Sequence, residues 1–233
     1  MPIGFAFLIT LSAAILWLRI NDFLAEKKII SNKLSRKIIH IGTGPIFVLC
    51  WLLFPENQIS RLVAAIIPFL ISLQFLLIGL GVMKDKASVD AMSRSGDPKE
   101  ILFGPLFYGI VFVLITTFFW KDSLVGIIAL MILCGGDGIA DIVGRRINSR
   151  KLPWSTTKTV VGSLGMFFGG FIFSLLISLV FINTLNIQIG IEILVIRLIF
   201  INIVATLVES LPIKDIDNLT VPLAAIVIGL LLF

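Results

Sequence analysis

Charged side chains are scarce in this sequence. Asp, Glu, Lys and Arg make up 14% of its 233 residues, whereas a soluble domain carries about 25%. Hydrophobic residues make up 58%, and the mean hydropathy is +1.09. This composition provides too little polar surface for a water-soluble globule, so it excludes that class and indicates a protein that lies in lipid.

Residues that build common soluble active sites are also few. The sequence has one histidine, His40, and two cysteines, Cys50 and Cys134, which fall in separate apolar stretches. The absence of a Cys-x-x-Cys pair argues against a zinc or dithiol site. The P-loop, Gly-x-Ser-x-Gly, His-Glu-x-x-His and Gly-x-Gly-x-x-Gly patterns are absent too, which excludes the mechanisms of soluble kinases and serine hydrolases.

Long apolar stretches dominate what is present. A transmembrane helix needs about 20 mostly apolar residues, and only helices or closed barrels satisfy the backbone in lipid. The runs are continuous, without the alternation of a barrel strand. We therefore predict an all-α polytopic integral membrane protein with about seven to eight transmembrane helices, in one multi-pass domain over residues 1–233. The candidate spans are residues 3–21, 38–54, 60–82, 101–119, 123–143, 160–183, 189–208 and 219–233.

The charges that are present gather in alternate loops. Nearly all Lys and Arg residues lie at about 22–37, 83–100, 144–159 and 209–218. The positive-inside rule places these loops in the cytoplasm, and topology explains the basic pI without nucleic-acid binding. Acidic residues gather in the same loops although that rule does not require it, which favours a polar site on this face.

The sharpest motif is CGGDGIADIVGRR at residues 134–146. Asp137, Asp141 and Arg145 follow one another at four-residue steps, so on a helix they share one face. Two carboxylates are suited to Mg²⁺, which binds one or two carboxylates together with phosphate oxygens. The arginine is suited to phosphate, and Gly138 lets a ligand approach the backbone closely.

Other charged residues are expected near this helix. Arg146 and Lys158 belong to a basic loop suited to a polyphosphate, and Glu209 ends the seventh span at the same depth, where it would complete the metal site. The turn at residues 93–100 adds Arg94, Asp97 and Lys99 on the same face.

His40 lies near the cytoplasmic start of the second span. We expect it either to be simply hydrogen-bonded or to contact phosphate and relay the proton of an alcohol. Metal-binding acids, phosphate-binding bases and a lipid-embedded body together favour phosphoryl or nucleotidyl transfer to a lipid.

Several short motifs follow one another in order from about residue 36 to the C-terminus. They are SRSGDP (93–98), GPLFY (104–108), CGGDGIADIVGR (134–145), KLPW (151–154), KT (158–159), GS (162–163), VESLP (208–212) and DNLTVPL (217–223). As a set they resemble the phytol kinases, within the wider polyprenol kinase group. The pattern differs at Val160 and Val161, where an aromatic and Ala are expected, and at Asn148, where Gly is expected.

The resemblance implies an enzyme that phosphorylates phytol, with CTP as donor, in the salvage of phytol toward tocopherol in a photosynthetic organism. Our mechanistic hypothesis has Asp137 and Asp141 holding Mg²⁺ on the triphosphate and basic residues, Lys158 among them, binding phosphates. His40 or a free carboxylate takes the alcohol proton. The N-terminal stretch lacks the composition of a transit peptide, so we expect a bacterial, cyanobacterial-type cell or thylakoid membrane.

Three alternatives remain open at this stage. A phosphatidate cytidylyltransferase-like CDP-lipid synthase has a related signature but releases pyrophosphate. A dolichol or farnesol kinase differs only in the tail of its substrate. A membrane transporter, for which Glu192 and Arg197 are the only midspan charges, is a different class.

Overall fold

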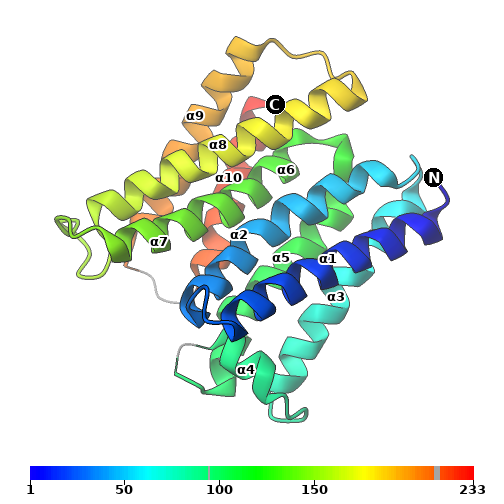
Figure 1. The fold of residues 1–233 in the computed structure, drawn as a ribbon. Coiled ribbons are helices and arrows are strands. Elements are labelled where there is room, and N and C mark those ends of the chain that lie inside the picture. The colour runs from blue at the N-terminus through cyan, green and yellow to red at the C-terminus, as the bar shows by residue number, and fades with distance from the viewer. Residues whose placement is uncertain (94, 213–215) are drawn as a thin grey trace.

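The computed structural model describes residues 1–93, 95–212 and 216–233, and within these ranges it is built from helices without a named strand. Figure 1 shows them packed side by side in one bundle. The predicted all-α class is confirmed. The helices are α1 (Ile3–Glu26), α2 (Asn32–Cys50), η1 (Trp51–Leu53), α3 (Gln58–Gly79), α4 (Lys86–Met92), η2 (Pro98–Leu102), α5 (Gly104–Phe118), η3 (Trp120–Asp122), α6 (Leu124–Met131), η4 (Ile132–Asp137), α7 (Gly138–Arg146), α8 (Val160–Leu185), α9 (Ile191–Ser210) and α10 (Asp217–Leu232).

Every predicted span is helical. In the described part of the chain, seven helical stretches are long and apolar enough to cross a membrane. The eighth, α10, has 16 residues; at about 1.5 Å per residue it is shorter than a hydrocarbon core of about 30 Å. It packs instead against α9, α6 and α5 inside the bundle. The prediction of seven to eight spans is therefore confirmed by length and composition.

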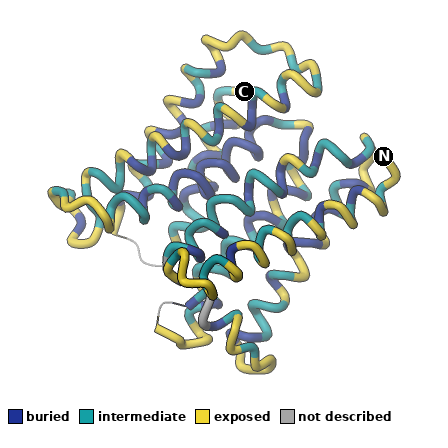
Figure 2. Tube along the Cα trace, viewed as in Figure 1, coloured by how far each residue is buried: buried dark blue, intermediate teal, exposed yellow. Residues whose placement is uncertain are grey.

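The fifth span forms the centre of the bundle. It runs through α6, η4 and α7. In its most apolar 18-residue stretch 78% of the residues are buried, more than in any other span of the described chain. All residues of α6 are buried, as the dark-blue trace in Figure 2 shows. The middle segment, η4, is a π-helix that ends at Asp137. Single π turns inside α-helices occur frequently at functional sites.

Small residues bring α8 close to this central span. A Cβ on Gly144 would stand 3.2 Å from the Cα of Gly162, and one on Gly162 would stand 3.6 Å from the carbonyl oxygen of Ala140. Such contacts allow two membrane helices to approach closely. They fix the start of α8, and thereby the loop before it, beside α7.

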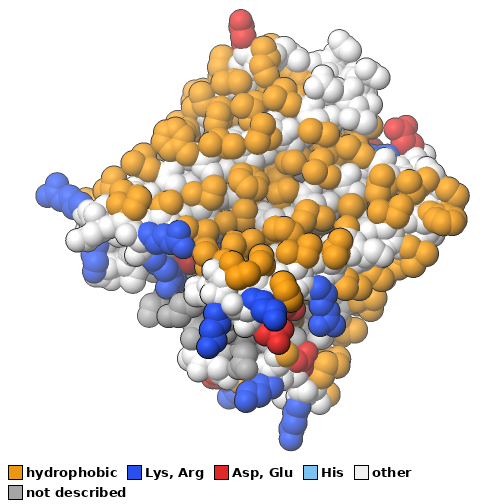
Figure 3. Space-filling model, viewed as in Figure 1, with side chains coloured by type: hydrophobic (Ala, Val, Ile, Leu, Met, Phe, Trp, Pro, Cys, Tyr) orange, Lys and Arg blue, Asp and Glu red, His pale blue; other side chains and the backbone are white. Residues whose placement is uncertain are grey.

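The charged residues gather at one end of the helices. Figure 3 shows Lys, Arg, Asp and Glu side chains concentrated at the lower end of the view, below a surface dominated by apolar side chains. Large apolar residues are exposed along the helix sides, including Phe5, Leu62, Phe168 and Phe200. A bilayer covers such surfaces without cost, so the helix sides face lipid and the charged end faces water.

Candidate active site

One large cavity opens among the charged helix ends and continues between the helices. Its volume is about 1210 Å³. Its charged end is lined by Lys37, Asp137, Asp141, Arg145, Lys151, Lys158, Glu209 and Asp217. Its apolar arm is lined by residues such as Trp17, Leu18, Ile46, Phe47, Ile67, Pro68, Ile71 and Phe112. The cavity therefore offers a polar and a lipid-like environment in one continuous space.

Asp137 lies at the charged end, at the junction of η4 and α7. Its Oδ2 is 3.6 Å from Lys37 Nζ and 3.3 Å from His40 Nε2, both on α2. Its side chain is 19% exposed. A carboxylate within a span is costly unless it is paired or functional, and here both neighbours are potential cations.

Asp141 lies one turn further along α7. Its Oδ1 accepts a 2.7 Å hydrogen bond from Arg145 Nε, and its Oδ2 is 3.4 Å from Lys37 Nζ. The prediction that Asp137, Asp141 and Arg145 share one helix face is thereby confirmed. Lys37 pairs with both carboxylates, since its ammonium lies within ion-pair distance of each.

The loop before α8 folds back as a short hairpin that carries Lys158. Leu152 N donates to the Lys158 carbonyl at 3.0 Å, and Val160 N donates to Arg150 at 2.9 Å. The Ser155 hydroxyl accepts from Lys158 N at 3.1 Å. The hairpin places the Lys158 side chain in the cavity lining.

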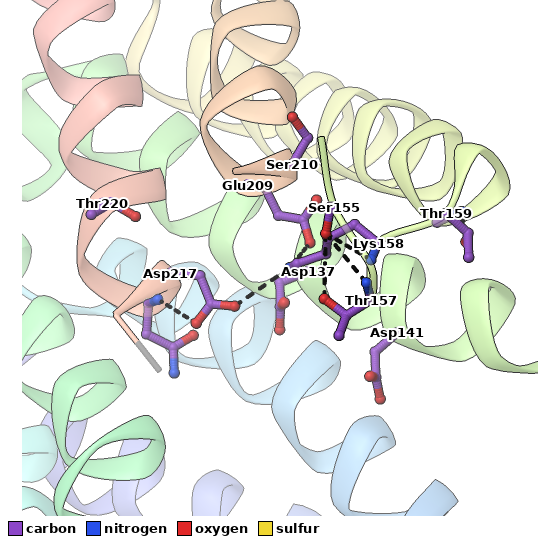
Figure 4. A network of polar contacts seen from close by, with 12 residues as sticks. Asp137, Asp141, Ser155, Thr157, Lys158, Thr159, Glu209, Ser210, Asp217 and Thr220 are labelled. Atoms are coloured by element: carbon purple, nitrogen blue, oxygen red, sulfur yellow. Dashed lines mark hydrogen bonds and ion pairs between the residues drawn. The ribbon is translucent and has the colours of Figure 1, made fainter. Parts of the chain in front are cut away.

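Lys158 pairs with two carboxylates from the last two helices. Its ammonium contacts Glu209 of α9 directly and lies 3.7 Å from Asp217 of α10. Figure 4 shows these side chains converging with Asp137. Burial opposes the charge on Lys158, but the two carboxylates outweigh it and raise the pKa of the ammonium above its ordinary value. Lys158 is therefore a permanent cation at neutral pH.

The Nε2 atom of His40 lies close to two oxygen atoms. That nitrogen is 3.3 Å from both Asp137 Oδ2 and the Leu133 carbonyl oxygen. Two acceptors at one nitrogen favour the tautomer with the proton there. The Tyr108 hydroxyl donates to the His40 carbonyl at 2.9 Å, and the two rings lie 4.5 Å apart. This arrangement fixes the imidazole so that it orients Asp137.

Asp137 and Asp141 could hold a magnesium ion. Each directs its Oδ2 toward the Lys37 ammonium, so a metal ion that took the place of this ammonium would have two carboxylates. In the described chain no group of three or more His, Cys, Asp or Glu side chains is arranged to hold a metal. Glu209, the predicted third ligand, pairs with Lys158, and the metal site stays a prediction.

Four predicted phosphate-binding residues lie away from the cavity wall. The exposed Asp97 caps η2 by accepting from Lys99 N at 2.9 Å, and the Lys99 side chain is exposed. Gly138 packs against Ile41 of α2, so it serves helix packing. Arg146 lines a small depression next to the cavity, which shares Lys37, Asp141 and Arg145 with it. Arg145 and Lys158 do line the cavity, and Arg94 lies outside the described residues.

Sequence reasoning missed Lys37 as a site residue and interpreted it only as a loop charge. A signal was available, because Lys37 precedes His40 by three residues and so shares its helix face. It also gave no role to Asp217, which reaches the site from α10. The positions that depart from the family pattern do not disturb the site. Val160 and Val161 begin α8 and do not line the cavity. Asn148 does not have a left-handed backbone conformation.

Comparisons with known proteins identify several kinases. A probable phytol kinase, chloroplastic, from Triticum aestivum is 40% identical over 232 residues, which cover 99% of this chain and 77% of the relative. Phytol kinase 1, chloroplastic, from Arabidopsis thaliana is 38% identical and covers 91% and 70%. Farnesol kinase, chloroplastic, from the same plant is 41% identical and covers 90% and 69%. No family model matches the chain. No solved structure matches it either.

These relatives bear on two predictions. They are named as chloroplastic plant proteins, which does not fit the expected bacterial membrane. That expectation relied on the composition of the N-terminal stretch, which is weak evidence of source. The family resemblance is confirmed by identity along nearly the whole sequence. The chain belongs to the phytol kinase family, within the polyprenol kinases, and is an enzyme that phosphorylates an isoprenoid alcohol.

Proposed function

We propose that this protein transfers the γ-phosphate of CTP, with Mg²⁺, to the hydroxyl of phytol, in the salvage of phytol toward tocopherol. The observation that carries the proposal is the single cavity that joins a charged end to an apolar arm. A nucleotide from water and an alcohol from lipid could meet in this cavity, whose charged end holds Asp137. Farnesol is the second candidate, because a relative of similar identity is named a farnesol kinase.

The charged end supplies what phosphoryl transfer requires. Phosphoryl transfer is catalysed mainly by positioning the reactants and neutralising charge. Asp137 and Asp141 would hold Mg²⁺, and the bound ion would offset charge on the triphosphate and act as a Lewis acid on its phosphoryl oxygens. Lys37, Arg145 and Lys158 line the cavity and would contribute positive charge to the bound triphosphate.

The alcohol proton needs an acceptor. The bond between the γ-phosphorus and the bridging oxygen breaks, CDP leaves, and the alcohol oxygen forms the new bond to phosphorus. We assign the proton to a carboxylate that does not hold the metal, Asp217, which lines the charged end of the cavity, because His40 already directs its Nε2 proton toward Asp137. His40 then acts as a positioning residue for Asp137, held in turn by Tyr108.

A transfer assay tests the proposal. Membranes that contain the protein are given Mg²⁺, CTP labelled on the γ-phosphate, and phytol. We expect label in phytyl phosphate and an equal amount of CDP, with transfer stopped by EDTA and restored by added Mg²⁺. ATP and farnesol are then tested as alternative donor and acceptor. If phosphatidate instead gives a CDP-lipid and pyrophosphate, the protein is a cytidylyltransferase and the proposal is wrong.

Lys37 provides a second test. Lys37→Met removes the cation shared by Asp137 and Asp141, and we expect kcat to fall about 100-fold, as when one charge-stabilising group is removed. Lys99→Met is the matched control, since that side chain is exposed and lies off the cavity wall. Equal effects of the two variants in the same transfer assay would contradict a role for Lys37 in the site.

Charge distribution also supports an orientation. The basic end of the bundle would face the compartment that holds nucleotide, in accordance with the positive-inside rule. The chloroplastic names of the relatives favour a thylakoid-type membrane for this step. A cysteine introduced at the exposed Arg150 checks this placement. Its reaction with an impermeant thiol reagent is measured in sealed vesicles of known orientation.

A further inference from the structure

We infer that the apolar arm of the cavity binds the isoprenoid tail and that its closed end, formed by Phe47, Ile67 and Phe112, limits the tail length that the enzyme accepts. The inference rests on the proposed function, because it takes the alcohol hydroxyl to lie beside Asp137. It adds a location for the tail and a set of residues that determine specificity.

Four helices form the arm. α1 and α3 both contribute wall residues, while α2 and α5 connect the arm to the charged end through His40 and Tyr108. Both of these residues line the same cavity, so the hydroxyl end of an alcohol at Asp137 would continue directly into the arm. The wall includes Thr10, Ala14, Trp17 and Leu18 from α1, Ile46 and Phe47 from α2, Ile67, Pro68 and Ile71 from α3, and Gly109 and Phe112 from α5.

The rise per residue of an α-helix gives the depth of the arm. Phe47 follows His40 on α2, and this step corresponds to about 10 Å along the helix axis. Phe112 follows Tyr108 on α5 by about 6 Å. The arm therefore extends from the level of His40 about 10 Å toward the hydrocarbon region.

An aromatic cluster blocks the arm beyond this depth. The Phe47 ring lies 5.8 Å from Phe112 and 6.0 Å from Trp51, and Trp51 lies 5.0 Å from Trp120. Trp51 and Trp120 are 0% and 3% exposed. They lie past the cavity wall, and the buried ammonium of Lys121 donates to the Phe54 carbonyl at 2.9 Å behind them. A tail therefore cannot continue straight toward the opposite membrane face.

Ala14 is the position at which to test this. Its side chain lines the arm from α1. This helix lies at the edge of the bundle, and only 11% of the residues in its most apolar 18-residue stretch are buried. A larger residue there fills the arm without disturbing the central span. Ser12→Phe is the matched control, because Ser12 is an exposed residue on the same helix that does not line the cavity.

The experiment compares geraniol, farnesol and geranylgeraniol, which differ by one isoprene unit each, as acceptors for wild type and variants. We expect Ala14→Phe to lower kcat/KM most for geranylgeraniol and least for geraniol, changing their ratio by at least about tenfold, the discrimination that small volume changes give in apolar pockets. Phe47→Leu, which opens the closed end, should raise the relative rate of an alcohol one unit longer than geranylgeraniol. Ser12→Phe should leave the order of preference as in wild type.

The outcomes separate this inference from the proposed function. If wild type phosphorylates these alcohols but Ala14→Phe and Phe47→Leu both leave the preference unchanged, the tail lies elsewhere, in lipid beside the bundle, and the inference is wrong. If wild type phosphorylates no alcohol, the proposed function itself fails.

Discussion

Asp137→Asn should reduce phosphate transfer at least about 1000-fold, the upper range for loss of one group that stabilises transition-state charge. The asparagine has the same shape and still meets His40 and Lys37, but it removes the negative charge that a magnesium ion requires. Asp141 alone would then hold the ion, with Lys37 as a competitor at 3.4 Å. The measurement is kcat with saturating CTP and alcohol over a range of Mg²⁺ concentrations.

The control for this variant is Asp122→Asn. Asp122 is an exposed carboxylate in η3, at the opposite end of the fifth span, so its loss should leave turnover at the wild-type level. The amounts of both variants in the membrane and their melting temperatures in detergent should match wild type. Near-normal turnover of Asp137→Asn, in protein that is present and folded, would refute the assignment of Asp137 to the metal.

The membrane fold was readable from the sequence because apolar stretches of about 20 residues admit one backbone solution in lipid. Each predicted span corresponds to a helix, with ends that shift by a few residues. α1 continues to Glu26, past the predicted end at residue 21, because a helix extends beyond the apolar core into the interface. The four-residue spacing of Asp137, Asp141 and Arg145 likewise predicted that they share one face, because this segment was expected to be helical.

Contacts between helices were not readable in the same way. The glycines after Cys134 looked suited to a ligand, yet Gly136 packs against Met166 and Gly138 against Ile41. Which neighbour a small residue admits depends on the arrangement of helices, and one sequence does not specify it. Glu209 was predicted as a metal ligand for the same reason: its depth was right, but the hairpin that directs Lys158 to it was not visible. The apolar arm was also hidden, since its wall comes from four separate helices.

Lys158→Met should have two effects that a second substitution separates. It removes the partner of Glu209, whose side chain is 5% exposed, and leaves a buried carboxylate uncompensated. Breaking a buried pair in this way costs on the order of 3 kcal/mol of folding free energy, so the melting temperature in detergent should fall clearly. It also removes a permanent cation from the charged end of the cavity, and transfer should fall about 100-fold or more.

The double variant Lys158→Met with Glu209→Gln decides what the lysine does. Without the carboxylate there is no unpaired buried charge, so the melting temperature should recover toward the wild-type value. Activity should stay low, because the phosphate still lacks the cation. Arg150→Met, an exposed change in the same hairpin, controls for damage to the loop. Recovery of both stability and transfer in the double variant would mean that Lys158 only neutralises Glu209, and phosphate binding would then depend on Arg145 and Lys37.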